Sequence, residues 1–152
     1  MKSLFKLASL SDLEILTELI REFYIHEKMV FSRQAVCYTL QQILNNDGYG
    51  QIYLVCINQE IIGYFAVIFS FSLEYHGRNA ILDELYIREQ YRRQGIGKQT
   101  IQFVKEICRK KGINALHLEV DHQNTNAQRL YRQVGFVDSH RSLMSQWLSV
   151  DE

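Results

Sequence analysis

Residues 82–97 read Leu-Asp-Glu-Leu-Tyr-Ile-Arg-Glu-Gln-Tyr-Arg-Arg-Gln-Gly-Ile-Gly, and this stretch decides the fold of the chain. It starts as an apolar strand with an acidic pair and ends in a glycine turn that opens a helix. Backbone N–H groups at a helix N-terminus lack partners within the helix and carry partial positive charge, so they can bind a pyrophosphate. Gly95 and Gly97 have no Cβ, which allows the backbone to approach a ligand closely. The stretch therefore predicts a site for a phosphate-bearing cofactor.

The spacing of the glycines excludes the two commonest phosphate-binding motifs. A dinucleotide fingerprint needs a third glycine at position 100, where the chain has Thr100. A Walker A loop needs Ser or Thr after its lysine, but Lys98 is followed by Gln99. What remains is the pattern Arg92-x-x-Gly95-x-Gly97.

The periodicity on either side of this stretch predicts a mixed order of helices and strands. Apolar residues at three-and-four spacing indicate helices, and runs rich in β-branched and aromatic residues indicate strands. The expected elements are a first strand, helices over 11–27 and 32–44, a hairpin over 51–73, a strand over 80–87, a helix ending at 109–112, a strand over 116–120, a helix from about 124 and one or two strands within 137–148. The strand–helix–strand crossover in this order predicts an α/β or α+β fold.

Two motifs together resemble those of the GCN5-related N-acetyltransferase (GNAT) family. The pattern from Arg92 to Gly97 resembles the family's pyrophosphate-binding turn. The segment 124–136, Asn-Thr-Asn-Ala-Gln-Arg-Leu-Tyr-Arg-Gln-Val-Gly-Phe, resembles its later motif, in which an Asn begins a helix and a Tyr faces the thioester. Because the motifs occur in the family's order, separated by a helix and a strand, they are more specific together than either is alone.

The resemblance covers essentially the whole chain and implies the family's architecture. That architecture is an α/β (α+β) fold with a mixed, mostly antiparallel sheet of six to seven strands and about four flanking helices. The chain has no proline and no Ser/Gly-rich linker, so residues 1–152 are expected to form a single N-acetyltransferase domain.

The resemblance also implies a cofactor and its binding residues. The cosubstrate would be acetyl-CoA, with its pyrophosphate on the glycine turn and its pantetheine arm along the edge of the strand over 80–87. The implied cofactor-binding residues are Leu85, Tyr86, Ile87, Arg92, Arg93, Gln94, Gly95, Ile96, Gly97, Lys98 and Asn124.

The chemistry of acetyl transfer assigns roles to two further residues. An alkylamine has a pKa of about 10 and is mostly protonated near pH 7, so the acceptor needs a base. Glu84 or its neighbour Asp83 could be that base, because both lie on the strand that would hold the thioester. Burying a carboxylate costs free energy unless it is paired or solvated, so the presence of two acids on a buried strand indicates a function. Tyr131 would protonate the departing thiolate, since a phenol pKa of about 10 lies above the thiol's 8.5 or so. Transfer would be direct, in a ternary complex.

Each of these roles has a structural alternative. Tyr131 can be an amphipathic core residue, and Asn124 can be only a helix cap. The acidic pair can be part of a structural network with arginines; because neighbouring strand residues face opposite sides, only one of the two need be catalytic. For the whole chain, the alternatives are a non-catalytic acyl-CoA-binding or regulatory module and a partner-binding scaffold.

The sequence gives no clear pattern for the acceptor. By the family's architecture, Tyr24, His26, Glu27, Phe31 and Glu74 would lie near it. His117 and Glu119 share a strand face and are further candidates. The Asp-Glu pair resembles the Glu-Asp pair of polyamine acetyltransferases with the acids exchanged, which favours a cationic amine. A small-molecule, peptide or protein amine, an amino acid and an aminoglycoside stay open.

Composition limits the partners and the compartment. With 17 basic and 17 acidic side chains the net charge is zero, so nucleic acid and membrane surfaces are not expected partners. No apolar run suits a membrane span or a signal peptide, which favours the cytoplasm. Cys37, Cys56 and Cys108 lack zinc or disulfide spacing, and the five histidines lack ligand spacing, so no metal is expected. An edge strand near the C-terminus makes a homodimer possible.

Overall fold

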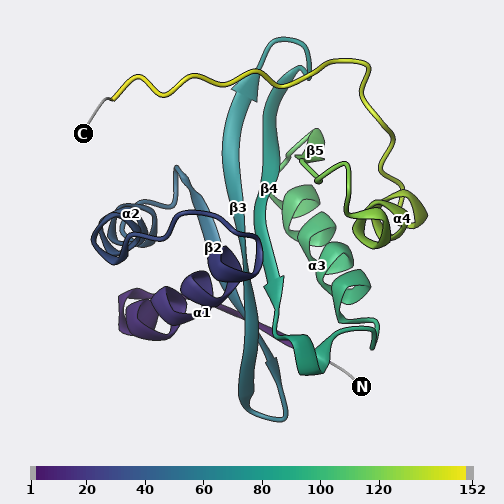
Figure 1. Cartoon of the computed structure of the whole chain (residues 1–152). Helices are drawn as coiled ribbons and strands as arrows, with labels where there is room; N and C mark the ends of the chain where they lie inside the picture. The colour runs from purple at the N-terminus through teal and green to yellow at the C-terminus, as the bar shows by residue number, and fades with distance from the viewer. Residues whose placement is uncertain (1–2, 150–152) are drawn as a thin grey trace.

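The computed structural model describes residues 3–149 of the chain, and it contains a five-stranded sheet flanked by four α-helices and two short 3-10 helices (Figure 1). In chain order the elements are β1 (Leu4–Leu7), η1 (Leu10–Asp12), α1 (Leu13–His26), α2 (Arg33–Leu44), β2 (Gly50–Ile57), β3 (Glu60–Ser72), β4 (Gly77–Ile87), η2 (Glu89–Tyr91), α3 (Ile96–Lys110), β5 (Ala115–Leu118) and α4 (Thr125–Gln133). The expected α+β class, the mixed sheet and the four helices are confirmed.

The strands follow one another across the sheet in the order β1-β2-β3-β4-β5. The first four are antiparallel to their neighbours, whereas β5 is parallel to β4 because α3 crosses over between them. The sheet is therefore mostly antiparallel, with one parallel pair at its edge.

The predicted number of six to seven strands is wrong for the residues that the structure describes. Residues 137–149, whose apolar side chains predicted one or two final strands, form an extended segment outside the sheet. A strand exists only where a neighbouring strand completes its hydrogen bonds, and this segment runs past the β3–β4 turn instead of returning to β5 (Figure 1). Arg141 in the segment pairs with Glu74 in that turn, at 2.8 Å.

The helices cover the two faces of the sheet, and each face has its own core (Figure 1). On one face, α1 and α2 pack on alternate residues of β2 and β3, with Leu16, Leu54 and Tyr64 fully or almost fully buried. On the other face, α3 packs Ile101 and Val104 against the remaining residues of the same strands. Both cores form because successive side chains of the central strands point to opposite faces of the sheet.

Local sequence signals place the ends of the helices close to where they were expected. The Ser32 hydroxyl accepts a hydrogen bond from the Ala35 N–H at 3.3 Å and begins α2. The Asn124 side chain does the same for α4, accepting from the Ala127 N–H at 3.1 Å. Such caps satisfy N–H groups that the first turn of a helix leaves open.

One irregularity in β4 decides which face its acidic residues reach. Opposite β3, Ala66 pairs with Glu84 and the next residue, Val67, pairs with Leu82, so Asp83 is an extra residue in the ladder. This β-bulge reverses the alternation along β4. As a result Glu84 and Tyr86 face α1, whereas Leu82 and Leu85 face α3.

Candidate active site

A cleft of about 1010 Å³ opens where β4 and β5 stop pairing. β5 is hydrogen-bonded to β4 only as far as Leu82, so within residues 3–149 the rest of β4 has no strand on that side. The cleft is lined by residues 82–87 of β4, the chain after β5, the glycine turn, α4 and the end of α1. An open strand edge of this kind can bind an extended ligand through its backbone groups.

The glycine turn forms one end of the cleft. Gly95 is the N-cap of α3 and has a φ of 81°, in the left-handed region that disfavours side chains. A Cβ placed on it would meet nothing within 4 Å, so the space in front of the turn is open. The first N–H groups of α3 have no partners within the helix. The turn therefore fits an anionic phosphate group.

Gly97 makes a close packing contact that the sequence did not suggest. It is not among the glycines with positive φ, and a Cβ there would lie 3.1 Å from Leu130 Cδ2. Gly97 therefore lets α4 pack closely against the start of α3. This contact brings the residues of α4 to the cleft.

The structure brings nearly all of the predicted cofactor-binding residues together. Those that line the cleft are Leu85, Tyr86, Ile87, Arg92, Arg93, Gly95, Ile96, Gly97, Lys98 and Asn124. Gln94 is not among the lining residues; it is exposed, and its amide donates to the Gln90 carbonyl at 3.3 Å. In a turn this tight, neighbouring side chains point in different directions, which sequence spacing does not show.

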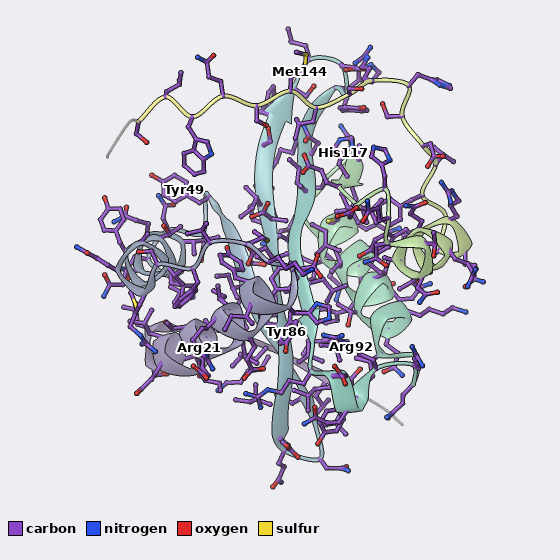
Figure 2. The ribbon with its side chains drawn as sticks, viewed as in Figure 1. Arg21, Tyr49, Tyr86, Arg92, His117 and Met144 are labelled. Atoms are coloured by element: carbon purple, nitrogen blue, oxygen red, sulfur yellow. The ribbon has the colours of Figure 1, made fainter. Side chains whose placement is uncertain are left out.

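Arg92 lies across the lower end of β4, close to Tyr86 (Figure 2). Its Nε donates to the Ile87 carbonyl oxygen at 2.7 Å, and its guanidinium lies 5.5 Å from the centre of the Tyr86 ring. Its Nη1 is 3.3 Å from Nε2 of His26, at the end of α1. Arg92, which was predicted to bind a phosphate, thus contacts the strand that would hold the pantetheine arm.

Glu84 is held on both of its oxygens by phenols. Tyr64 donates to Oε1 and Tyr24 donates to Oε2, each at 2.6 Å. Burial raises the pKa of the Glu84 carboxyl, while the two phenol hydrogen bonds oppose that rise. Burial, followed by the neighbouring Glu84 carboxylate, raises the pKa of both phenols, so they remain donors. The β-bulge at Asp83 makes this arrangement possible.

Tyr131 lines the cleft from α4. Burial raises its pKa, and the Glu27 carboxylate raises it further, so the hydroxyl is protonated at neutral pH. Its ring packs edge-on against Phe136, with the ring centres 6.0 Å apart. Asn124, which was predicted to bind the cofactor and could also be only a cap, is a cap that lines the cleft.

The candidate acceptor residues divide into three groups. His26, Glu27 and Glu119 line the cleft, whereas Tyr24 reaches Glu84 from α1 with Phe31 packed on it. Glu74 and His117 lie elsewhere.

Glu74 is in the β3–β4 turn, where Arg141 pairs with it, and His117 packs at a tilt against Tyr75, with ring centres 4.5 Å apart. The sequence reasoning also missed residues of the site. Phe23 and Asp121 line the cleft and Tyr64 binds Glu84. The strand alternation that places Tyr64 and Glu84 on one face was visible only in part, because the bulge interrupts it.

Residues 3–149 contain neither a cluster of metal-binding side chains nor a helix that could span a membrane. No three His, Cys, Asp or Glu side chains in this part of the chain are grouped so that they could hold a metal ion. None of its helices has the length and apolar character needed to cross a membrane. The cytoplasmic location stays a prediction.

Comparison with known sequences identifies the family. The model of the acetyltransferase (GNAT) family matches residues 13–136. A thialysine N-epsilon-acetyltransferase of Mus musculus is 33% identical over 91% of this chain and 85% of its own length. The protein of that name from Bos taurus is 34% identical over 79% of this chain and 75% of its own length.

Solved structures agree with this assignment. An integron cassette protein from the mobile metagenome of Cole Harbour Salt Marsh is 28% identical, with a TM-score of 0.86 over 97% of this chain and 91% of its own. A predicted acetyltransferase from Clostridium acetobutylicum, solved with acetyl-CoA, shares the fold at 16% identity, with a TM-score of 0.81 over 95% of this chain and 96% of its own. The chain, an acetyl-CoA-dependent N-acetyltransferase, therefore belongs to the acetyltransferase (GNAT) family.

Proposed function

We propose that this enzyme transfers an acetyl group from acetyl-CoA directly to the amine of a small cationic acceptor, and that it does so in the cleft beside β4. The observation that carries the proposal is that one cleft joins an open helix N-terminus, a buried glutamate and a protonated tyrosine. Residues on both faces of the sheet support this cleft, so we also propose that the chain works as one domain.

The glycine turn is the proposed binding site for the pyrophosphate. Gly95 leaves open space before the first N–H groups of α3, and Arg93 and Lys98 add positive charge at the same end. The backbone of Leu85–Ile87 is proposed to bind the pantetheine arm. The Ile87 carbonyl oxygen accepts from Arg92 and has a second lone pair for the arm; if Arg92 releases this oxygen, its guanidinium becomes available for a phosphate.

Glu84 is the proposed base. Attack on the thioester carbonyl carbon needs the amine lone pair, so a proton must leave an ammonium acceptor before the C–N bond forms. Burial raises the pKa of Glu84 towards neutral pH, where a carboxylate is a more effective base than at its ordinary value. Asp83 is an alternative base, because burial raises its pKa too and it also lines the cleft.

Tyr131 is the proposed acid. When the C–S bond breaks, the sulfur leaves as a thiolate, and the phenol supplies the proton that makes it a thiol. The second proton of the reacting amine leaves as the amide forms and restores the phenol of Tyr131, while Glu84 releases the first proton to solvent, so the transfer balances. Direct transfer is supported by the cysteines, none of which lines the cleft, and by burial, which raises the pKa of Cys56 and Cys108.

The proposed acceptor is a primary amine on a small molecule with positive charge. Four carboxylates support this choice. They line the cleft but do not belong to the glycine turn: Glu27, Asp83, Glu119 and Asp121. Relatives of this chain are named for the acetylation of thialysine, of D-amino acids and of aminoglycosides. Among these, thialysine is the acceptor to test first, together with lysine as its close analogue.

The first experiment is calorimetric titration with acetyl-CoA and CoA, followed by measurement of thiol release with a panel of amines. The panel should contain thialysine, lysine, a polyamine, an aminoglycoside and a D-amino acid. We expect saturable binding of CoA and thiol release that depends on the amine. Binding without release from any amine would contradict the proposed reaction.

The variant Tyr131→Phe tests the mechanism. We expect it to bind CoA like the original protein and to turn over roughly 100-fold more slowly, the lower end of the range for losing an acid catalyst. Tyr38→Phe is the matched control, because Tyr38 is exposed on α2 and does not line the cleft. Unchanged turnover in Tyr131→Phe would remove the residue from the mechanism.

A further inference from the structure

His26 is the last residue of α1, and the way in which this helix ends places its side chain. The N–H groups of Lys28 and Met29 donate back to carbonyl groups of the last turn, at 3.2 and 2.8 Å, in the pattern of a Schellman C-cap. Lys28 holds the left-handed position of this cap, with a φ of 58°, where glycine is the usual residue. The helix therefore stops at a defined point, and His26 and Glu27 line the cleft.

The ring of His26 contacts a charged residue through each of its two nitrogen atoms. Nδ1 lies 3.0 Å from Oε2 of Glu27, and Nε2 lies 3.3 Å from Nη1 of Arg92. An arginine side chain can only donate hydrogen bonds, so Nε2 has to accept and cannot carry a proton. The ring proton is therefore on Nδ1, where it donates to the Glu27 carboxylate. The two contacts together define one tautomer of a neutral ring.

Arg92 is the residue that this tautomer holds, and it has two further contacts on β4 (Figure 2). Its Nε donates to the Ile87 carbonyl at 2.7 Å, and its guanidinium lies over the Tyr86 ring. Its Nη2 has no hydrogen-bond partner among residues 3–149. The guanidinium is thus held at the rim of the cleft with part of its donors unused.

The unused donors belong to the edge of the group that suits a phosphate. Nε and Nη2 form one edge of a guanidinium, and arginine uses such an edge to make paired bonds to a carboxylate or a phosphate. Arg88 shows this pairing in the same chain, with Nε and Nη2 donating to the two oxygens of Glu22 at 3.0 and 2.9 Å. In Arg92 only the Nε half of the edge is bonded, to Ile87. If the pantetheine arm takes the Ile87 oxygen, the whole edge becomes available while His26 still holds Nη1.

We propose that His26 is a positioning residue for acetyl-CoA, whose Nε2 fixes Arg92 so that the Nε–Nη2 edge receives a phosphate of the cofactor. This inference rests on the proposed binding of the pyrophosphate at the glycine turn. It moves His26 from the acceptor side of the cleft, where the sequence placed it, to the donor side. An arginine side chain loses rotamer freedom when it binds a ligand, and a contact that already holds the guanidinium removes part of this cost.

Calorimetric titration with CoA tests the proposal in a double-mutant cycle. We expect His26→Leu to bind CoA roughly 2- to 10-fold more weakly than the original protein, the range for one hydrogen bond. Arg92→Met should bind roughly 10- to 100-fold more weakly, because hydrogen bonds to charged groups are stronger. Adding His26→Leu to Arg92→Met should weaken binding no further, since His26 acts only through Arg92.

His26→Gln and Ile25→Ala are the matched variants. Gln has an amide oxygen that can accept from Arg92, so it should restore most of the affinity that Leu loses. Ile25 is 59% exposed at the same end of α1 and does not line the cleft, so its truncation should leave the affinity unchanged. The His26 side chain is itself 49% exposed, so its variants should fold, and thermal unfolding checks this.

The ring nitrogens of His26 allow a second measurement that does not depend on affinity. Nitrogen-15 NMR distinguishes the two neutral tautomers of a histidine ring, and at about pH 8 such rings are mostly neutral. We expect the Nδ1–H tautomer for His26 in the protein without CoA, with its signals assigned by comparison with His26→Gln. The Nε2–H tautomer would overturn the proposal, because that nitrogen could not accept from Arg92.

The calorimetric outcomes separate the role of His26 from the proposed function. Failure of the original protein to bind CoA would overturn both. Normal binding by the original protein, with an unchanged affinity in His26→Leu, would overturn only the role of His26. An equal loss from His26→Leu with and without the Arg92 side chain would do the same, because His26 would then act independently of Arg92. An unchanged affinity in Arg92→Met would remove the phosphate contact on which the proposal depends, and so overturn it.

Discussion

At the residue scale, Glu84 shows how a carboxyl group can be buried and still remain usable. Its two oxygens each accept a hydrogen bond from a phenol, which lowers the cost of ionising it in an apolar layer. Burial nevertheless dominates, and the pKa is raised above its ordinary value. The phenols therefore act as positioning residues that fix the carboxyl group and set how easily it gains and loses a proton.

The variant Tyr64→Phe tests this role. It removes the donor to Oε1, one of the interactions that keep the Glu84 pKa from rising further, so the pKa should rise. A base must be ionised to work, so we expect the acidic limb of the pH profile of kcat/KM to move to higher pH. The control is Tyr53→Phe, because the Tyr53 hydroxyl donates to Gln51 on the opposite face of the sheet. An unmoved limb would show that Glu84 does not set it.

The same variant should change how stability depends on pH. A carboxyl group whose pKa is raised in the folded state stabilises that state below its unfolded pKa, and this contribution is lost as pH rises through the folded pKa. The stability deficit of Tyr64→Phe should therefore grow as pH rises through the folded-state pKa of Glu84, which lies above its ordinary value, towards about 1–3 kcal/mol for a buried acceptor left without its donor. Denaturant unfolding at several pH values measures this deficit. A deficit that is largest at low pH would contradict the expectation.

At the element scale, the start of α3 combines backbone geometry with ligand binding. Gly95 caps the helix at a φ of 81°, and Arg93 just before it has a φ of 63°. Arg93 thus holds a conformation that costs roughly 1–2 kcal/mol for a residue with a side chain. Strain of this kind is often found at functional turns.

The variant Gly95→Ala should weaken cofactor binding. The added methyl group meets no atom within 4 Å, so the change acts through backbone strain, about 1–2 kcal/mol, and through the space in front of the turn. Gly112→Ala is a close control, because Gly112 has a φ of 69° and equally open space but lies at the other end of α3. We expect both variants to lose stability in thermal unfolding and only Gly95→Ala to lose affinity for CoA in calorimetry. Equal affinities would contradict a role for the turn in binding.

Elements whose signals are local could be predicted from the sequence, and those that depend on distant partners could not. The spacing of Leu13, Leu16 and Leu19 and the caps at Ser32 and Asn124 give α1, α2 and α4 within a few residues of their observed ends. The β-bulge at Asp83 depends on the register between β3 and β4, which neither strand shows alone.

The candidate site divides in the same way. The glycine turn and the Asn124–Phe136 motif are continuous in sequence, and the residues predicted from them line the cleft with the exception of Gln94. Tyr24 and Tyr64 are 60 and 20 residues away from Glu84 in the chain; the packing of α1 on the sheet brings Tyr24 to it, and the pairing of β3 with β4 brings Tyr64. Residues 137–149 were predicted to form one or two strands because they contain many apolar side chains. Whether they pair depends on a neighbouring strand, which the sequence of the segment does not show.

At the scale of the whole molecule, the cleft lies among elements from both faces of the sheet, so a ligand there should stabilise the entire fold. CoA at about 100 times its dissociation constant should add roughly 2.7 kcal/mol to the free energy of unfolding. For a chain of this size that corresponds to about 5–10 °C in Tm. Thermal unfolding with and without CoA measures the effect, with adenosine as a control that lacks the pyrophosphate and the pantetheine arm. An equal shift with adenosine would contradict binding along the glycine turn and β4.

The two core clusters on opposite faces of the sheet have no residue in common. Changes in separate packing layers tend to add without interfering with one another. Helix α1 and the loop after it, which carry residues of the proposed acceptor side, can therefore accumulate substitutions while the layer beneath the glycine turn keeps its packing. A lineage built on this plan can diversify the amines that it accepts and keep a single acetyl donor, so substrate range and donor use can evolve at separate rates.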